Sequence, residues 1–185
     1  MLKVLAISGS LRDDSFNTKL LRAAAELAPP GAEVELWNGL KAVPPFDEDD
    51  EGGQAPAGVV ALHDAIAGAD ALLFATPEYN SSIPGQLKNA IDWASRPKAT
   101  APIRNKASAV IGASTGMFGA VWAQAELRKV LASAGARVVE GELPVPVAHT
   151  RFDADGRLSD EEARERLAEI VASLAAVAER IPVAA

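Results

Sequence analysis

The chain has 185 residues, 49% hydrophobic and 23% charged, a composition that predicts a packed core in one domain spanning residues 1–185. Its 25 acidic and 18 basic residues give a net charge of −7, which argues against nucleic acid and anionic membranes as partners, because both require a basic surface. The sequence has no cysteine, which excludes disulfides, thiol catalysis and cysteine-ligated metals.

Strand-like and helix-like patterns alternate from the N-terminus. Residues 3–8 predict a short strand. This run is too short to cross a membrane and lacks a signal-cleavage pattern, so a cytoplasmic protein is expected. Ser15 can cap a helix that ends before Pro29-Pro30-Gly31. Residues 33–37 predict an edge strand. A long irregular stretch with an acidic run follows at residues 38–58, and a helix at residues 59–67.

The second half of the chain continues this alternation. Residues 70–76 predict a fully buried strand, and Pro84 is expected in the first turn of the following helix. A strand at 106–112 precedes a helix at 120–134, which Gly135 ends. We expect a fifth strand, then a loop, at residues 137–143 and 144–156. Ser159 and Glu162 form a capping box for the last helix.

Five strand–helix units predict an α/β fold, with a parallel sheet between two layers of helices. Because the sequence has no GxGxxG motif, we expect a flavodoxin-like three-layer sandwich with its five strands in the order 2-1-3-4-5. Strands one, three and four are then neighbours. The loops at their carboxyl ends meet where open α/β sheets bind ligands, so three separate segments would form one site.

The first of these loops, residues 8–17, has the chemistry of an anion site. Ser10 and Ser15 supply hydroxyls, Arg12 supplies a cation, and the start of the helix supplies free backbone N–H groups. A glycine-serine turn with Ser15 as a helix cap explains the same residues about equally well.

The second loop, residues 77–89, places prolines, one aromatic residue and an amide directly after the buried strand. Four residues at its start suit the binding of a flat ring with polar edges better than proton abstraction: Pro77, Glu78, Tyr79 and Asn80. Loop punctuation and helix-start hydrogen bonding explain each residue singly, but not their density. In the third loop, Ser114 and Gly116 either let the backbone approach a ligand or only permit a turn.

Three motifs in these loops span most of residues 1–140. They are Gly9-Ser10-Leu11-Arg12-x-x-Ser15-x-Asn17, Thr76-Pro77-Glu78-Tyr79-Asn80-x-Ser82-Ile83-Pro84-Gly85-x-Leu87-Lys88-Asn89-Ala90-x-Asp92-Trp93, and Gly112-Ala113-Ser114-x-Gly116-x-x-Gly119. With this spacing the chain resembles the NADPH-dependent FMN reductase family, which includes quinone, chromate and azo-dye reductases. Two positions depart from the common family pattern: Ala120 replaces a glycine and Thr115 a proline.

The resemblance implies an FMN site with two ends. Five residues would hold the 5′-phosphate, partly through the backbone: Ser10, Arg12, Ser15, Phe16 and Asn17. The ring and ribityl side would be lined by Pro77, Glu78, Tyr79 and Asn80, and the ring edge by Ser114 and Gly116.

It also implies a ping-pong oxidoreductase. NADPH or NADH would deliver hydride to the flavin, and a small acceptor (free flavin, quinone, chromate or an azo compound) would then take the electrons. No catalytic acid or base is needed, and a homodimer or homotetramer is expected.

Two alternatives remain: a non-enzymatic flavodoxin-like electron carrier, although Arg12 is unusual beside the phosphate of such a carrier, and a flavin-free phosphate-binding module. A metal site is not expected, because the chain has only two histidines, His63 and His149, and no cysteine. The acidic run at 47–51 lacks EF-hand spacing and is expected to be a solvated loop. The sequence leaves NADPH and NADH equally open.

Overall fold

The computed structural model describes residues 1–52 and 55–181. Its strands are β1 (Leu2–Ser8), β2 (Ala32–Trp37), β3 (Ala71–Ala75), β4 (Ala107–Ala113), β5 (Arg137–Val138) and β6 (Pro144–Val145). The α-helices are α1 (Phe16–Glu26), α2 (Ala57–Ala67), α3 (Gly85–Ala94), α4 (Val121–Ser133) and α5 (Glu161–Glu179). Short 3₁₀ helices lie at Leu40–Ala42, Glu48–Gly52 and Ala148–Thr150.

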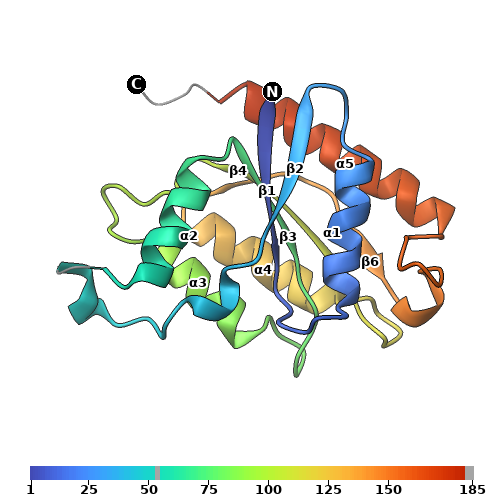
Figure 1. The fold of residues 1–185 in the computed structure, drawn as a ribbon, viewed down its shortest axis with the longest axis horizontal. Coiled ribbons are helices and arrows are strands. Elements are labelled where there is room, and N and C mark those ends of the chain that lie inside the picture. Colours follow the sequence, from blue (N-terminus) through green and yellow to red (C-terminus); the bar gives the residue numbers. More distant parts are fainter. Residues whose placement is uncertain (53–54, 182–185) are drawn as a thin grey trace.

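These strands form one parallel sheet in the order β2-β1-β3-β4-β5, and β6 pairs with β4 beyond the end of β5. Helices α1 and α5 pack in one core cluster with one face of the sheet, and α2, α3 and α4 pack in a second cluster with the other (Figure 1). Because helices cover both faces, every residue of β3 and β4 is buried. The predicted three-layer fold and strand order are confirmed, and a short sixth strand is added.

The helix ends follow simple capping chemistry, with two corrections. Ser15 caps α1 as predicted, since its hydroxyl accepts a hydrogen bond from the Thr18 N–H at 3.5 Å. Pro84 occupies the N-cap position of α3 rather than its first turn. Asp160, not Ser159, caps α5, because its carboxylate accepts the Ala163 N–H at 2.9 Å.

The predicted strand over residues 137–143 is interrupted. The Val139 N–H still donates to the Ser108 carbonyl at 2.8 Å, but Gly141 then adopts a φ of +133°, which takes the chain out of register with β4. Pairing resumes at Pro144, so the predicted loop over 144–156 begins with a strand. The irregular stretch over 38–58 likewise contains two 3₁₀ helices within its described part.

Candidate functional site

Three loops follow the central strands at one edge of the sheet: loop A (residues 9–15) after β1, loop B (residues 76–84) after β3 and loop C (residues 114–120) after β4. They gather at the lower edge of the view in Figure 1. The Gly9 N–H donates to the Ala75 carbonyl at 2.8 Å, and the Thr76 N–H donates to the Ile111 carbonyl at 3.0 Å. These bonds tie the start of loop A to β3 and the start of loop B to β4.

Loop A holds its polar groups close to the start of α1. The Arg12 N–H lies 3.4 Å from the Ser10 hydroxyl, and the Arg12 side chain is exposed. In the described ranges 1–52 and 55–181, the Phe16 and Asn17 backbone N–H groups have no hydrogen-bond partner. Free amides at a helix start beside an arginine are a suitable set of donors for a phosphate.

The side chain of Asn17 has a structural partner on β4. The amide donates to the Ala113 carbonyl at 3.0 Å and accepts from the Ala113 N–H at 2.9 Å, and Asn17 is only 3% exposed. The last residue pair between β3 and β4 is Ala75 with Ile111, so Ala113 lies beyond the end of β3. The Asn17 amide replaces the missing strand there, and its backbone N–H remains available to a ligand.

Loop B contains a tight hairpin turn. Tyr79 and Ser82 exchange backbone hydrogen bonds of 3.0 and 3.1 Å. Asn80 and Ser81 between them have φ values of +53° and +61°, as in a type I′ turn. Pro77 is buried beneath the turn, whereas Tyr79 is 48% exposed at its tip. The loop therefore presents its aromatic residue and amide on a rigid support.

The Glu78 carboxylate joins loop B to α4. It accepts hydrogen bonds from the backbone N–H groups of Trp122 and Ala123, each at 3.1 Å. Helix α4 needs this acceptor, since its own N-cap residue, Ala120, has no polar side chain and adopts a φ of +62°. Helix-start hydrogen bonding, one of the interpretations left open for Glu78, is correct, although the helix is α4 and not the adjacent α3.

Loop C rests on a fourth segment, loop D (residues 146–150), which lies within the predicted loop over 144–156 but was not predicted to belong to the site. The Val147 and Ala148 N–H groups donate to the carbonyls of Gly116 and Ser114, both at 3.0 Å. Within loop C, the Ser114 hydroxyl accepts the Gly116 N–H at 3.0 Å. The alternating apolar residues Leu143, Val145 and Val147 were a readable signal for the short strand that leads into loop D.

Gln124 also supports the site, in a role that the sequence did not indicate. It is 1% exposed on α4, donates to the Gly119 carbonyl at 3.0 Å and accepts from the Leu143 N–H at 3.4 Å. It therefore secures loop C to the segment before β6. A lone glutamine inside a helical pattern gives no warning of such a role.

Large apolar side chains are exposed around the loops. Phe118 and Trp122 are 58% and 49% exposed, and their ring centroids lie 4.8 Å apart. Met117 and Leu11 are also exposed, in loops C and A. A rim of this kind favours contact with a flat ligand or with another protein surface.

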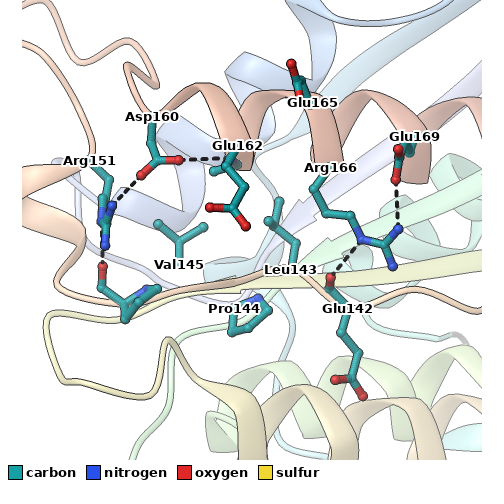
Figure 2. Close-up of a pocket in the computed structure, with 12 residues that line it drawn as sticks. Glu142, Leu143, Pro144, Val145, Arg151, Asp160, Glu162, Glu165, Arg166 and Glu169 are labelled. Atoms are coloured by element: carbon teal, nitrogen blue, oxygen red, sulfur yellow. Dashed lines mark hydrogen bonds and ion pairs between the residues drawn. The ribbon is translucent and has the colours of Figure 1, made fainter.

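A cleft of 530 Å³ lies away from these loops, between β6 and α5 (Figure 2). Five carboxylates and two arginines line it, and both arginines are paired, Arg151 with Asp160 and Arg166 with Glu169. Figure 2 also shows Arg166 directed to the Glu142 carbonyl, at 3.3 Å. This acidic lining disfavours a phosphate ligand.

Two further properties of the described residues bear on function. Residues 1–52 and 55–181 contain no group of three or more His, Asp or Glu side chains that could hold a metal ion. In the same part of the chain, each helix is too short or too polar to cross a membrane.

Comparison with known proteins identifies the family of the chain. The family model "NADPH-dependent FMN reductase" matches residues 2–150. An NAD(P)H-dependent FMN reductase of Pseudomonas aeruginosa is 46% identical over 89% of this chain and 88% of its own length. An NADPH:quinone oxidoreductase of Arabidopsis thaliana is 38% identical over 98% of this chain and 94% of its own.

The solved structure of FerB, a flavoenzyme NAD(P)H:(acceptor) oxidoreductase from Paracoccus denitrificans, superposes with a TM-score of 0.87. It is 36% identical, over 97% of this chain and 98% of that chain. Fold, motifs and relatives thus agree, and the chain belongs to the NADPH-dependent FMN reductase family, as an oxidoreductase with FMN as its cofactor.

Proposed function

We propose that the chain, as a single FMN-binding domain over residues 1–185, passes electrons from NAD(P)H to a quinone or free flavin in a ping-pong cycle. The observation that carries the proposal is the convergence of loops A, B and C at the carboxyl ends of the adjacent strands β1, β3 and β4. FMN supplies hydride acceptance and electron release when bound, so the chain itself must bind, orient and tune it.

Loop A would hold the FMN phosphate. Ser10, Arg12 and Ser15 provide hydroxyls and a guanidinium, and Phe16 and Asn17 provide the unpaired N–H groups of the first turn of α1. Asn17 would act through its backbone, since its side chain binds Ala113.

Loops B and C would line the ring. Three amides that could face a ring edge are already used: Tyr79 bonds Ser82, Ser114 bonds Val145, and Gly116 bonds the Ser114 hydroxyl. In the described part of the chain, the N–H groups of Glu78, Asn80 and Thr115 have no such partner. We therefore assign these three amides to the stabilisation of negative charge at the ring edge. Pro77 and Tyr79 would contact the ring and ribityl side.

Anaerobic mixing of the FMN-loaded protein with NADPH tests the enzyme against the electron carrier. Rapid bleaching of the flavin absorbance is expected, and bleaching only with an added partner protein would favour the carrier. A purified protein that is colourless and takes up no FMN would contradict both, and would favour a flavin-free phosphate-binding module.

Arg12→Ala tests the phosphate end. The variant should bind FMN about tenfold more weakly, as expected for one lost charge-assisted hydrogen bond, and riboflavin unchanged. Arg137→Ala, an exposed arginine on β5, is the control. An equal loss for FMN and riboflavin would contradict the role of Arg12.

We also propose a homodimer or homotetramer, in which the exposed Phe118 and Trp122 contact another copy. Sedimentation of Trp122→Glu should show smaller species than the unmodified protein. Chromate and azo compounds as acceptors, and a cytoplasmic location, stay predictions.

A further inference from the structure

A second cleft, of 370 Å³, opens beside loop A between the carboxyl ends of β1 and β2. Ser10 and Arg12 contribute to it from loop A, and Thr18 and Arg22 from α1. Trp37, Asn38 and Lys41 complete its wall from the end of β2 and the 3₁₀ helix at Leu40–Ala42. Ser15, Phe16 and Asn17 do not line it, so this cleft borders the phosphate end of loop A without including the first turn of α1.

The charge of this cleft is opposite to that of the chain. Arg12, Arg22 and Lys41 line it against one acid, Asp13, in a protein whose net charge is −7. Within residues 1–52 and 55–181, none of the three cations has a carboxylate within 4.0 Å. The nearby Asp14 is paired with Lys19 at 2.5 Å, a hydrogen bond that lowers the pKa of Asp14.

The other lining groups suit a nucleoside. Trp37 supplies an indole ring that lies directly against Gly39, where any side chain would collide with it. Asn38 adds an amide, and Ser8, Ser10 and Thr18 add hydroxyls. An aromatic wall next to unpaired cations can take a base or ribose on one side and a phosphate monoester on the other.

The charge of the residues beside an adenosine ribose selects between the two nicotinamide nucleotides. A carboxylate there binds a free 2′-hydroxyl, whereas an arginine accommodates a 2′-phosphate, and this rule of charge does not require the dinucleotide-binding fold, which this chain lacks. Here the end of β2 carries Asn38 and Lys41, with Arg22 facing from α1. This set favours a phosphate over a hydroxyl.

We infer that this cleft binds the 2′-phosphoadenosine end of NADPH and gives the protein a preference for NADPH over NADH. The inference rests on the proposed function, because it requires the nicotinamide end to lie at loops B and C. Arg22 and Lys41 contact the 2′-phosphate, and Trp37 contacts the adenosine.

Equilibrium titration of the FMN-loaded protein with adenosine 2′,5′-bisphosphate and with 5′-AMP tests the inference without turnover. The bisphosphate should bind more tightly. Arg22→Ala and Lys41→Ala should each weaken it by about tenfold, and leave both 5′-AMP and FMN binding unchanged. In steady state the same variants should raise the KM for NADPH and not for NADH. Lys129→Ala, an exposed lysine on α4, is the control.

Three results would overturn the inference. They are equal binding of the two nucleotides, bisphosphate binding that survives both substitutions, and a loss of FMN affinity in the two variants, which would mean that the cleft holds the FMN phosphate itself. Failure of the proposed function is a separate result, because it would appear as a protein that takes up no FMN at all.

Discussion

Removal of the Asn17 side chain should destabilise the protein before any ligand is considered. Asn17→Ala breaks two hydrogen bonds of 3.0 and 2.9 Å and leaves the N–H and the carbonyl of Ala113 buried without partners. Each unsatisfied buried group costs about 1–3 kcal/mol, so the loss of two partners should lower the free energy of unfolding by about 2–6 kcal/mol. For a chain of this size the melting temperature should drop by on the order of 10 °C.

Urea unfolding of the FMN-free protein is the direct assay, with Asn38→Ala as the control. Asn38 is exposed at the end of β2, and its substitution should change the free energy of unfolding by less than about 0.5 kcal/mol. Asn17→Asp is a second probe. It keeps an acceptor for the Ala113 N–H but places a carboxylate oxygen against the Ala113 carbonyl, so it should also destabilise.

The opposite pattern would refute this reasoning. If the Asn17 side chain served the FMN phosphate directly, Asn17→Ala would weaken FMN binding while the FMN-free protein unfolded as before. A change of less than about 1 kcal/mol in the FMN-free protein would therefore reject the structural role.

The remaining predictions concern caps and a glycine. Glu78→Ala should lower the free energy of unfolding by about 1 kcal/mol, because α4 loses its cap. Glu78→Gln keeps an acceptor and should retain most of that stability in thermal unfolding. Equal losses for the two variants would contradict the capping role. The hydrogen bond from the Ala163 N–H holds the pKa of Asp160 below its ordinary value of 3.8. The ionised carboxylate therefore stabilises the folded protein fully above that pH, and this stabilisation is lost as the pH falls further. In urea unfolding, Asp160→Asn should thus be destabilising at neutral pH, with a difference that shrinks as the pH falls below 3.8; a difference constant with pH would exclude the linkage. Gly119→Ala should lower the free energy of unfolding by about 1–3 kcal/mol or more, the usual cost of a strained backbone position, because φ is +58° and a Cβ would collide with β6. Gly116→Ala is the control, because a Cβ there would not collide with the backbone, and it should be the less destabilising of the two. Equal unfolding curves for the two variants would contradict the prediction.

The sheet order was predictable because it depends on coarse patterns. Buried apolar runs at β3 and β4 mark central strands, and the helices between strands require parallel crossovers. The end of the sheet was not predictable in the same way. The break after Val138 depends on the φ of Gly141, and a glycine in a strand-like run is also compatible with an unbroken strand.

The candidate site was predictable as a set of loops, but not residue by residue. Ser10 and Arg12 lie in loop A as expected, whereas Asn17 and Glu78 use their side chains to join elements. Both are polar residues near helix starts, and sequence cannot tell whether their partner is a ligand or a backbone group far along the chain. The contact from Asn17 to Ala113 spans 96 positions, beyond the range of any local pattern.

In the homo-oligomer that we propose, the contact between Glu78 and the Trp122 backbone would link the subunit interface to loop B. Trp122 donates its backbone N–H to the Glu78 carboxylate, and its indole is exposed at the surface where we propose that a neighbouring copy binds. Dissociation of the copies would expose the indole to solvent and weaken the hydrogen bonds between Glu78 and the start of α4. The turn at Tyr79 and Asn80, which follows Glu78, would then be held less firmly. The specific activity per chain would then fall as the protein is diluted, even while every chain remained folded.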